Sequence, residues 1–163
     1  MSKPADNKID LYVILHNIRS VYNVGSIFRT AEAVGATKIF CTGYTPTPTD
    51  RFGRKRDDFA KVALGAEEYV SWEKKDDVLR LIQELQDDNC RVVAAETKDQ
   101  AVDYRTMQSD QPTAVVLGNE VEGIPQTILD AVDTTIEIPM AGEKTSLNVS
   151  VTAGIILFSI RDG

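Results

Sequence analysis

The stretch LYVILHNIRSVYNVGSIFRTAEAVGATKIF, residues 11–40, decides the fold because it alternates between two kinds of pattern. Leu11–Leu15 and Lys38–Phe40 are short runs of the kind found in buried strands, whereas Val24–Val34 between them follows a helical pattern. A strand, a helix and a second strand in this order are typical of a parallel sheet.

The same alternation continues along the rest of the chain. Further strands are expected at Arg91–Ala95, Thr113–Leu117 and Thr134–Ile138, with a weaker candidate at Glu68–Trp72. Further helices are expected at Asp76–Gln86, Gln126–Ala131 and Leu147–Ile160, and the last of these is apolar nearly all round, which predicts that it is buried. The pattern therefore predicts an α/β fold with a parallel sheet that helices cover on both faces.

Length and composition narrow the class of protein. The 163 residues suit a single domain, 1–163, and the 42% of hydrophobic residues supports a real core. No apolar run reaches the roughly 18 residues of a membrane span, and the start MSKPADNKID lacks the apolar stretch of a signal peptide, so we expect a cytoplasmic protein. Cys41 and Cys90 are too few and too scattered for a disulfide framework or a zinc site.

The net charge of −7 is unevenly distributed along the chain. Residues 1–66 carry 10 basic and 6 acidic side chains, a net of +4, while residues 67–163 carry 8 basic and 19 acidic ones, a net of −11. The segment Arg51–Lys61 holds five of the basic side chains, and four of these five lie in the long irregular stretch Cys41–Asp58. An anionic ligand such as RNA could therefore bind there in spite of the acidic total, although a solvated surface loop explains the cluster equally well.

Several familiar catalytic and nucleotide-binding signatures are missing. No two glycines are two residues apart, which excludes G-x-G-x-x-G, and Ile124 and Pro125 follow Gly123 where a P-loop needs Lys and Ser or Thr. His16 is the only histidine, so a cluster of histidine metal ligands is excluded, and no G-x-S-x-G elbow accompanies it. We expect no metal, and we interpret His16 as a structural or supporting polar group.

Polar clusters follow three of the predicted strands, where open α/β sheets bind their ligands. In the first, Asn23, Gly25 and Arg29 have the spacing N-x-G-x-x-x-R. Asn23 is expected to cap the helix, Gly25 to allow a close approach at its first turn, and Arg29 could bind a phosphate. An ordinary capped helix with a surface arginine is the alternative.

The second and third clusters are loops shaped by glycine and proline. In GNEVEGIP, residues 118–125, two glycines flank Glu120 and Glu122, so the backbone could touch a flat ligand while Glu120 accepts hydrogen bonds. In PMAGEKTSLNVS, residues 139–150, Ser146 could cap the last helix, and Asn148 and Ser150 would lie in its opening turn. Simple loop formation and helix capping are the alternatives for both.

Together, NVGSIFR, LGNEVEGIP and IPMAGEKTSLNVS resemble the three motifs of the SpoU (TrmH-like) branch of the SPOUT RNA methyltransferases, in the family's order and spacing. AVDYR, residues 101–105, and KVALGAEEYV, residues 61–70, also look like that family. The resemblance covers the chain from about Leu11 to Phe158.

The resemblance implies a parallel α/β sheet with a C-terminal trefoil knot that binds S-adenosylmethionine, in a homodimer whose subunits both contribute to each site. No pattern in the sequence indicates the knot, and knots are rare in general. Seven residues match the family's cofactor positions: Ala95, Leu117, Gly118, Ile138, Met140, Ser146 and Leu147. Such a lining is mainly apolar and suits adenine, and Glu120 would favour the positive methylsulfonium.

The reaction that the resemblance implies is methyl transfer to a ribose 2′-hydroxyl of RNA. Arg29 is at the family's catalytic position, and Asn23, Glu120, Ser146 and Asn148 would orient the substrate and the loop. A guanidinium stays protonated in proteins and is a poor base, so we favour an Arg29 that holds the RNA phosphate and stabilises the developing alkoxide.

Many relatives carry an additional RNA-binding region, whereas these motifs begin by residue 23 and the last helix ends near Arg161, which leads us to expect the catalytic core and little more. The expected RNA contacts are Arg19, Arg29, Arg51, Arg54, Lys55 and Arg56. We expect tRNA as the substrate, with rRNA as the alternative. A non-catalytic RNA-binding module and a base methyltransferase remain as rival interpretations.

Overall fold

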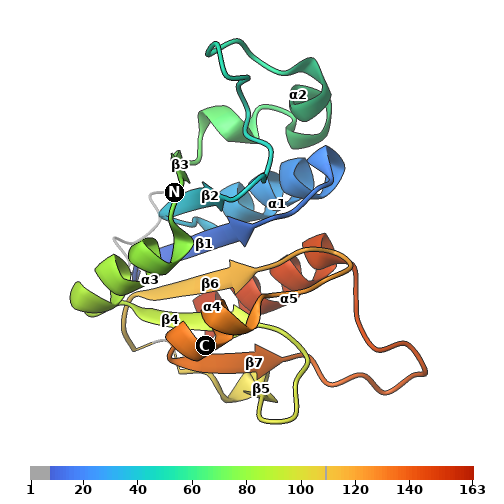
Figure 1. Ribbon diagram of the computed structural model, residues 1–163. Coiled ribbons are helices and arrows are strands. Elements are labelled where there is room, and N and C mark those ends of the chain that lie inside the picture. Colours follow the sequence, from blue (N-terminus) through green and yellow to red (C-terminus); the bar gives the residue numbers. More distant parts are fainter. Residues whose placement is uncertain (1–7, 109) are drawn as a thin grey trace, which may run out of the picture.

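The computed structural model describes residues 8–108 and 110–163, and within these ranges the chain forms a seven-stranded sheet in the order β3-β2-β1-β6-β4-β7-β5 (Figure 1). Every pair of neighbouring strands in it is parallel. The strands are β1 (Leu11–His16), β2 (Lys38–Thr42), β3 (Trp72–Lys75), β4 (Arg91–Ala95), β5 (Val102–Asp103), β6 (Thr113–Leu117) and β7 (Thr134–Glu137). The predicted α/β fold with a parallel sheet is therefore confirmed.

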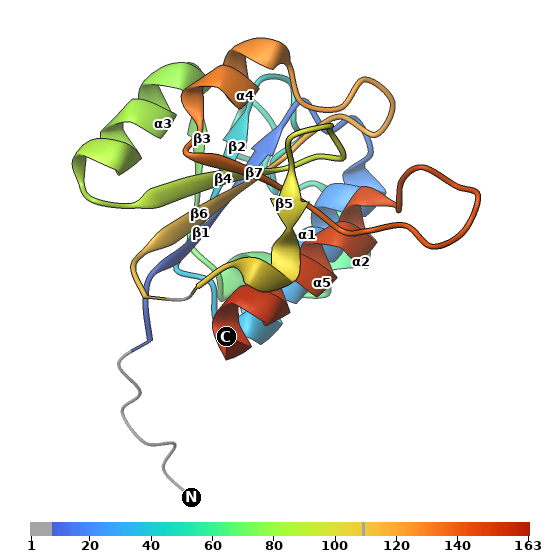
Figure 2. The same cartoon turned by 90° about the horizontal axis from the view of Figure 1, so that it is seen from below.

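Helices cover both faces of the sheet, as predicted (Figure 2). One face carries α1 (Val21–Val34) and α5 (Val149–Asp162), and the other carries α3 (Val78–Asp87) and α4 (Gln126–Ala131). The central strand β6 is buried along its whole length, because both of its faces are covered. A shorter helix, α2 (Asp57–Ala63), lies beside α1 near the end of the sheet formed by β3 and β2.

The sequence explains where the helices begin. Ser20 caps α1 by accepting a hydrogen bond from the Asn23 N–H at 3.1 Å, and Asp77 caps α3 by accepting one from the Arg80 N–H at 3.1 Å. Asn148 caps α5, because its Oδ1 accepts from the Ser150 N–H at 2.9 Å. The predictions that Asn23 caps the first helix and Ser146 the last were therefore wrong, and α1, α3 and α5 begin two or three residues away from the predicted start, whereas α4 has the predicted bounds.

Other differences from the prediction have physical causes. The strand expected at Glu68–Trp72 is instead β3 at Trp72–Lys75, since Ala66–Glu68 forms a turn of 3-10 helix. Helix α5 buries only one face, through Ala153, Ile156, Leu157 and Ile160, whereas Val151 and Phe158 are 49% and 42% exposed. The prediction of a helix buried all round was therefore wrong for this chain by itself.

Two elements were not predicted at all. Helix α2 occupies the end of the basic segment and is held against α1 by Phe59, whose ring contacts Phe28 edge to face at 5.0 Å between centroids. Gly25 permits this contact, because a Cβ at that position would lie 2.9 Å from the Cβ of Val62. The close approach predicted at Gly25 is thus an approach between two helices. The two-residue strand β5 pairs with β7.

Candidate active site

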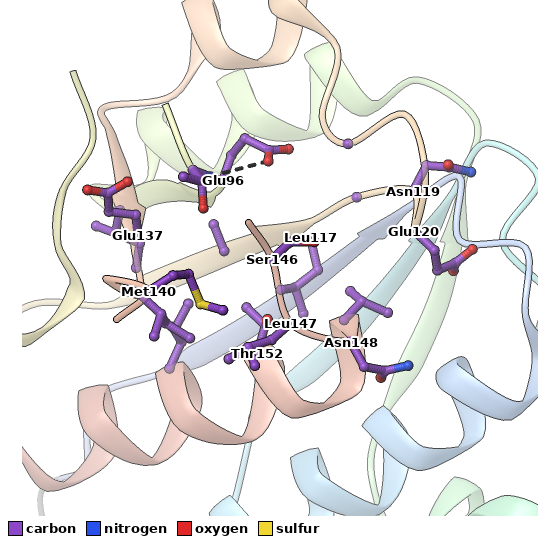
Figure 3. Close-up of a pocket in the computed structure, with 18 of the residues that line it drawn as sticks. Glu96, Leu117, Asn119, Glu120, Glu137, Met140, Ser146, Leu147, Asn148 and Thr152 are labelled. Carbon is purple, nitrogen blue, oxygen red and sulfur yellow. Dashed lines mark hydrogen bonds between the residues drawn. The ribbon is translucent and has the colours of Figure 1, made fainter. Parts of the chain in front are cut away.

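A cavity of about 370 Å³ lies beyond the carboxyl ends of β4, β6 and β7 (Figure 3). Parallel strands end at one edge of the sheet, so the loops that follow them converge there. All seven residues predicted at cofactor positions line this cavity: Ala95, Leu117, Gly118, Ile138, Met140, Ser146 and Leu147. The three segments that carry them are separated in the sequence by about 20 residues or more and meet only in the fold.

The loop after β6 is a tight turn that only glycines allow. Gly123 has φ +71°, and its N–H donates to the Asn119 carbonyl at 3.0 Å. A Cβ on Gly118 would lie 2.6 Å from Ile124 and 2.9 Å from the Gly123 carbonyl oxygen. Both glycines line the cavity, but contacts within the protein already require glycine at both positions.

Asn119 connects this loop to the ends of β1 and β2. Its Nδ2 donates to the Asn17 carbonyl and to the Tyr44 hydroxyl, both at 2.9 Å, while its Oδ1 accepts from the backbone N–H groups of Val121 and Glu122. Asn119 is buried, so these bonds compensate the loss of its hydration. Sequence reasoning missed this residue, although a Gly-Asn pair directly after a buried strand is a turn signal.

Carboxylates surround the apolar part of the cavity. Figure 3 shows Glu96, Glu137 and Met140 at one side of the view, Glu120 and Asn148 at the other, and Ser146 and Leu147 between them. Glu96 was also missed by sequence reasoning, and its Oε2 accepts from the Ile124 N–H at 2.9 Å, which joins the loop after β4 to the loop after β6. An acidic residue directly after a predicted strand was the signal that could have identified it.

The predicted catalytic residues divide into two groups. Glu120, Ser146 and Asn148 line the cavity. Asn23 is not part of the lining but accepts a hydrogen bond from Asn148 Nδ2 at 3.3 Å, which joins the first and third motifs. Arg29 is exposed on α1 and lies outside the cavity lining.

The predicted RNA contacts are exposed or partly exposed, and several are paired with acidic neighbours. Lys55 Nζ lies 2.8 Å from Glu68, Arg56 Nη2 lies 2.8 Å from Asp58, and Arg54 Nε lies 3.2 Å from Asp50. The hydrogen bond from Arg56 lowers the pKa of Asp58. Surface pairs of this kind contribute about 1 kcal/mol or less, so a phosphate can replace the carboxylate at little cost.

Two further predicted RNA contacts occupy different surroundings. The guanidinium of Arg51 lies 4.8 Å from the centre of the exposed Phe52 ring. The Arg19 N–H donates to Glu120 Oε2 at 3.3 Å, so the side chain of Arg19 begins next to the cavity. His16, the sole histidine, makes a 2.8 Å hydrogen bond through Nδ1 with Thr42 Oγ1, as expected for a structural group.

Residues 10–158 match the profile of the SpoU rRNA Methylase family. A candidate TrmH family tRNA/rRNA methyltransferase of Staphylococcus haemolyticus is 34% identical over 91% of this chain and 57% of its own length, so the chain spans a little over half of such relatives. The crystal structure of the TrmH/SpoU tRNA modifying enzyme of A. aeolicus is 29% identical, with a TM-score of 0.83 over 95% of this chain and 75% of that one.

The AdoMet-bound rRNA methyltransferase of Sinorhizobium meliloti is 28% identical, with a TM-score of 0.84 over 96% of this chain and 57% of that one. Among the residues described, no helix is long and apolar enough to cross a membrane. The sequence match, the fold and the convergence of the three motifs on one cavity agree, and the chain belongs to the SpoU rRNA methylase family.

Proposed function

We propose that the protein is an S-adenosylmethionine-dependent RNA methyltransferase that methylates a ribose 2′-hydroxyl, with tRNA as its substrate, in the cytoplasm. The observation that carries this proposal is the convergence of all seven expected cofactor residues on one cavity. Similar structures include one with bound AdoMet and one described as a tRNA modifying enzyme, each at 28–29% identity.

The lining of the cavity fits S-adenosylmethionine. Leu117, Ile138, Met140 and Leu147 offer apolar surface for the adenine ring, and the volume of about 370 Å³ lies in the range of small-molecule sites. Glu96, Glu120 and Glu137 belong to the lining and would provide negative charge for the cationic groups of the cofactor. When bound, the cofactor supplies an electrophilic methyl group.

The protein's own residues would position the nucleophile. Arg29 would bind an RNA phosphate and stabilise the negative charge that develops on the 2′-oxygen. Glu120 would orient the loop through its hydrogen bond from the Arg19 N–H. Asn148 and Asn23 are already hydrogen bonded to each other and would align the ribose with the methyl group, while the Ser146 hydroxyl is a further donor at the mouth of the site.

We propose that the working form is a homodimer in which Arg29 serves the cavity of the partner subunit. Arg29 lies outside the lining of its own cavity, and Tyr22 on α1 with Val151 and Phe158 on α5 leaves exposed apolar surface nearby. Helices α1 and α5 pack side by side, so both would contribute to a face that pairs with a second copy.

We also propose that the C-terminal part is threaded into the trefoil knot of the family. The strand order supports this: β6 lies between β1 and β4, and the chain from β7 to α5 then passes the ends of β4 and β6, where it forms a wall of the cavity.

The decisive test is to incubate the purified protein with methyl-labelled S-adenosylmethionine and total RNA from a strain that lacks the gene. We expect label in the tRNA fraction and a 2′-O-methylnucleoside by mass spectrometry. Label in rRNA would identify rRNA, and not tRNA, as the substrate. A methylated base would contradict the assignment of the ribose 2′-hydroxyl as the methylated group. Cofactor binding without any transfer would favour a non-catalytic RNA-binding module.

A further inference from the structure

A second hollow of about 530 Å³ adjoins the proposed active site and is lined by Arg19, Tyr44, Asn119, Val121 and Glu122. Asn119 and Val121 line both this hollow and the cofactor cavity, so the two share a wall. A ribose that presents its 2′-hydroxyl to the cavity would therefore place a neighbouring part of the RNA at the hollow.

Tyr44 is an exposed aromatic side chain with a fixed position. Tyr44 is 55% exposed, yet its hydroxyl accepts a 2.9 Å hydrogen bond from Asn119 Nδ2. The Tyr44 N–H donates to Asn17 Oδ1 at 3.1 Å, and the preceding Gly43 has φ +61°, so the backbone is held as well. A ring that is already ordered loses little conformational entropy when a flat ligand stacks on it.

The other residues of the hollow offer a cation for a phosphate, a hydrogen-bond acceptor for a base and further apolar surface. Arg19 places a cation on the exposed rim, and Glu122 places an exposed carboxylate beside it. A guanidinium can bind a phosphate, while a carboxylate accepts hydrogen bonds from base N–H groups. Val121 is 88% exposed and extends the apolar surface next to the ring.

From these contacts we propose that the hollow is a nucleotide subsite in which Tyr44 stacks on an unpaired base of the substrate RNA. The base belongs to the methylated nucleotide or to its neighbour, and Arg19 binds the adjoining phosphate. This inference rests on the proposed function, because it takes RNA to be the substrate. Tyr44 is then a specificity-determining residue whose ring contributes to RNA binding and does not line the cofactor cavity.

The test compares Tyr44→Ala and Tyr44→Phe with Tyr69→Ala, a control at an 80% exposed tyrosine outside both cavities. The probes are a fluorescently labelled single-stranded RNA of mixed sequence, measured by anisotropy, and S-adenosylmethionine, measured by calorimetry. Loss of one base stack predicts that Tyr44→Ala weakens RNA binding about tenfold, whereas Tyr44→Phe and Tyr69→Ala stay within about threefold of the wild type. Cofactor affinity stays unchanged in all three variants.

Salt dependence separates stacking from phosphate binding. Tyr44→Ala should leave the slope of log Kd against log salt unchanged, whereas Arg19→Ala should reduce it by about one phosphate contact. Equal RNA affinity of Tyr44→Ala and Tyr69→Ala would overturn the proposal, and so would a parallel loss of cofactor binding in Tyr44→Ala, because that loss indicates a structural role. Because the oligonucleotide assay needs no turnover, it remains decisive even if no methyl transfer is found.

Discussion

Arg29 is the residue that the motif predicts to be catalytic, yet it does not line the cavity. It is exposed on α1, whereas the predicted partners Glu120, Ser146 and Asn148 line the cavity. A role in binding the RNA phosphate is compatible with this exposure, because phosphates approach from solvent. A structural role is disfavoured, since no hydrogen bond of its guanidinium is found within the described part of the chain.

We predict that Arg29→Ala abolishes methyl transfer while S-adenosylmethionine affinity stays within about threefold of the wild type, because only charge stabilisation in the transition state is lost. Filter-bound radiolabel from a methylation assay and calorimetry measure the two quantities. Arg80→Ala is the matched control, since Arg80 is exposed on the other face of the sheet and pairs with Glu84. Loss of cofactor binding to the same extent as turnover would refute the division of roles.

His16 allows a clean test of pH dependence because it is the only histidine. Burial lowers its pKa below the ordinary value of 6.5. The unfolded chain then binds a proton more readily than the folded protein, so the free energy of unfolding should fall as the pH drops below about 6.5. Urea titrations between about pH 7.5 and 5.5 should show this decline in the wild type and a flatter profile in His16→Asn.

Two observations would distinguish this effect from general acid destabilisation. Carboxylates titrate mainly below about pH 5, outside the range measured. Thr42→Val removes the hydroxyl that bonds His16 Nδ1 but keeps the imidazole, so it should retain the decline with pH. If His16→Asn showed the same slope as the wild type, the burial of His16 would not be its cause.

At the scale of elements, α5 is fixed at both ends. Asn148 begins the helix and bonds Asn23 of α1, and Arg161 near its end donates to three carbonyl oxygens: Val34 at 3.1 Å, Ile9 at 2.8 Å and Gly35 at 2.8 Å. These carbonyls belong to the end of α1 and to the segment that precedes β1. One guanidinium therefore ties the last helix to the first strand and the first helix.

We predict that Arg161→Ala lowers the free energy of unfolding by about 2 kcal/mol, because several charge-assisted hydrogen bonds to carbonyls are lost at a partly buried position. Arg161→Lys should recover less than half of this loss, since an ammonium cannot reproduce the planar fork. Urea denaturation monitored through Trp72 provides the measurement. Arg105→Ala is the control, because the exposed side chain of Arg105 forms hydrogen bonds with its sequence neighbour Asp103 and should change stability by less than about 0.5 kcal/mol.

The long periodic elements were predictable from the sequence, whereas those that depend on tertiary contacts were not. Strands β1, β4, β6 and β7 were found within one residue at each end because their apolar runs are continuous. Helix α2 has seven residues, too few to be stable alone, and exists because Phe59 packs on Phe28. Strand β5 has two residues and is defined only by its pairing with β7.

In the candidate site, too, some features could be predicted from the sequence and others depend on tertiary contacts. The residues that carry the three motifs could be predicted to meet, because parallel strands bring their carboxyl ends to one edge. The contacts of Asn119 and Glu96 could not be predicted, since their partners Asn17, Tyr44 and Ile124 are 28 to 102 residues away in the sequence. The boundaries at Ser20 and Asn148 were missed because several residues near each helix start can cap it, and geometry alone selects one.

For the whole molecule, the uneven charge along the sequence corresponds to different places in the fold. The acidic part of the sequence includes Glu96, Glu120 and Glu137 around the cavity, which suits a cationic cofactor. The mildly basic part carries Arg19, Arg29 and the exposed basic segment, which suits RNA. A modest positive surface predicts binding that weakens steeply with salt and that gains from two subunits acting together.

A dimer with shared active sites makes a quantitative prediction for mixed variants. Arg29→Ala and Asn148→Ala should each be inactive alone. If Arg29 serves the partner's cavity, a mixed dimer has one site that carries both substitutions and one that carries none. Random exchange makes half of the dimers mixed, so an equimolar mixture should recover about a quarter of wild-type activity. If Arg29 served its own cavity, every site would carry one substitution and the mixture would stay inactive.

The control for this experiment removes the dimer itself. Phe158→Glu places a charge in the exposed apolar surface of α5, so the mass in sedimentation should fall from twice 18.0 kDa to 18.0 kDa. Adding Phe158→Glu to both members of the mixture should then eliminate the recovered activity, because it depends on subunits that pair. Recovery that persisted in 18.0 kDa monomers would contradict an active site shared between paired subunits.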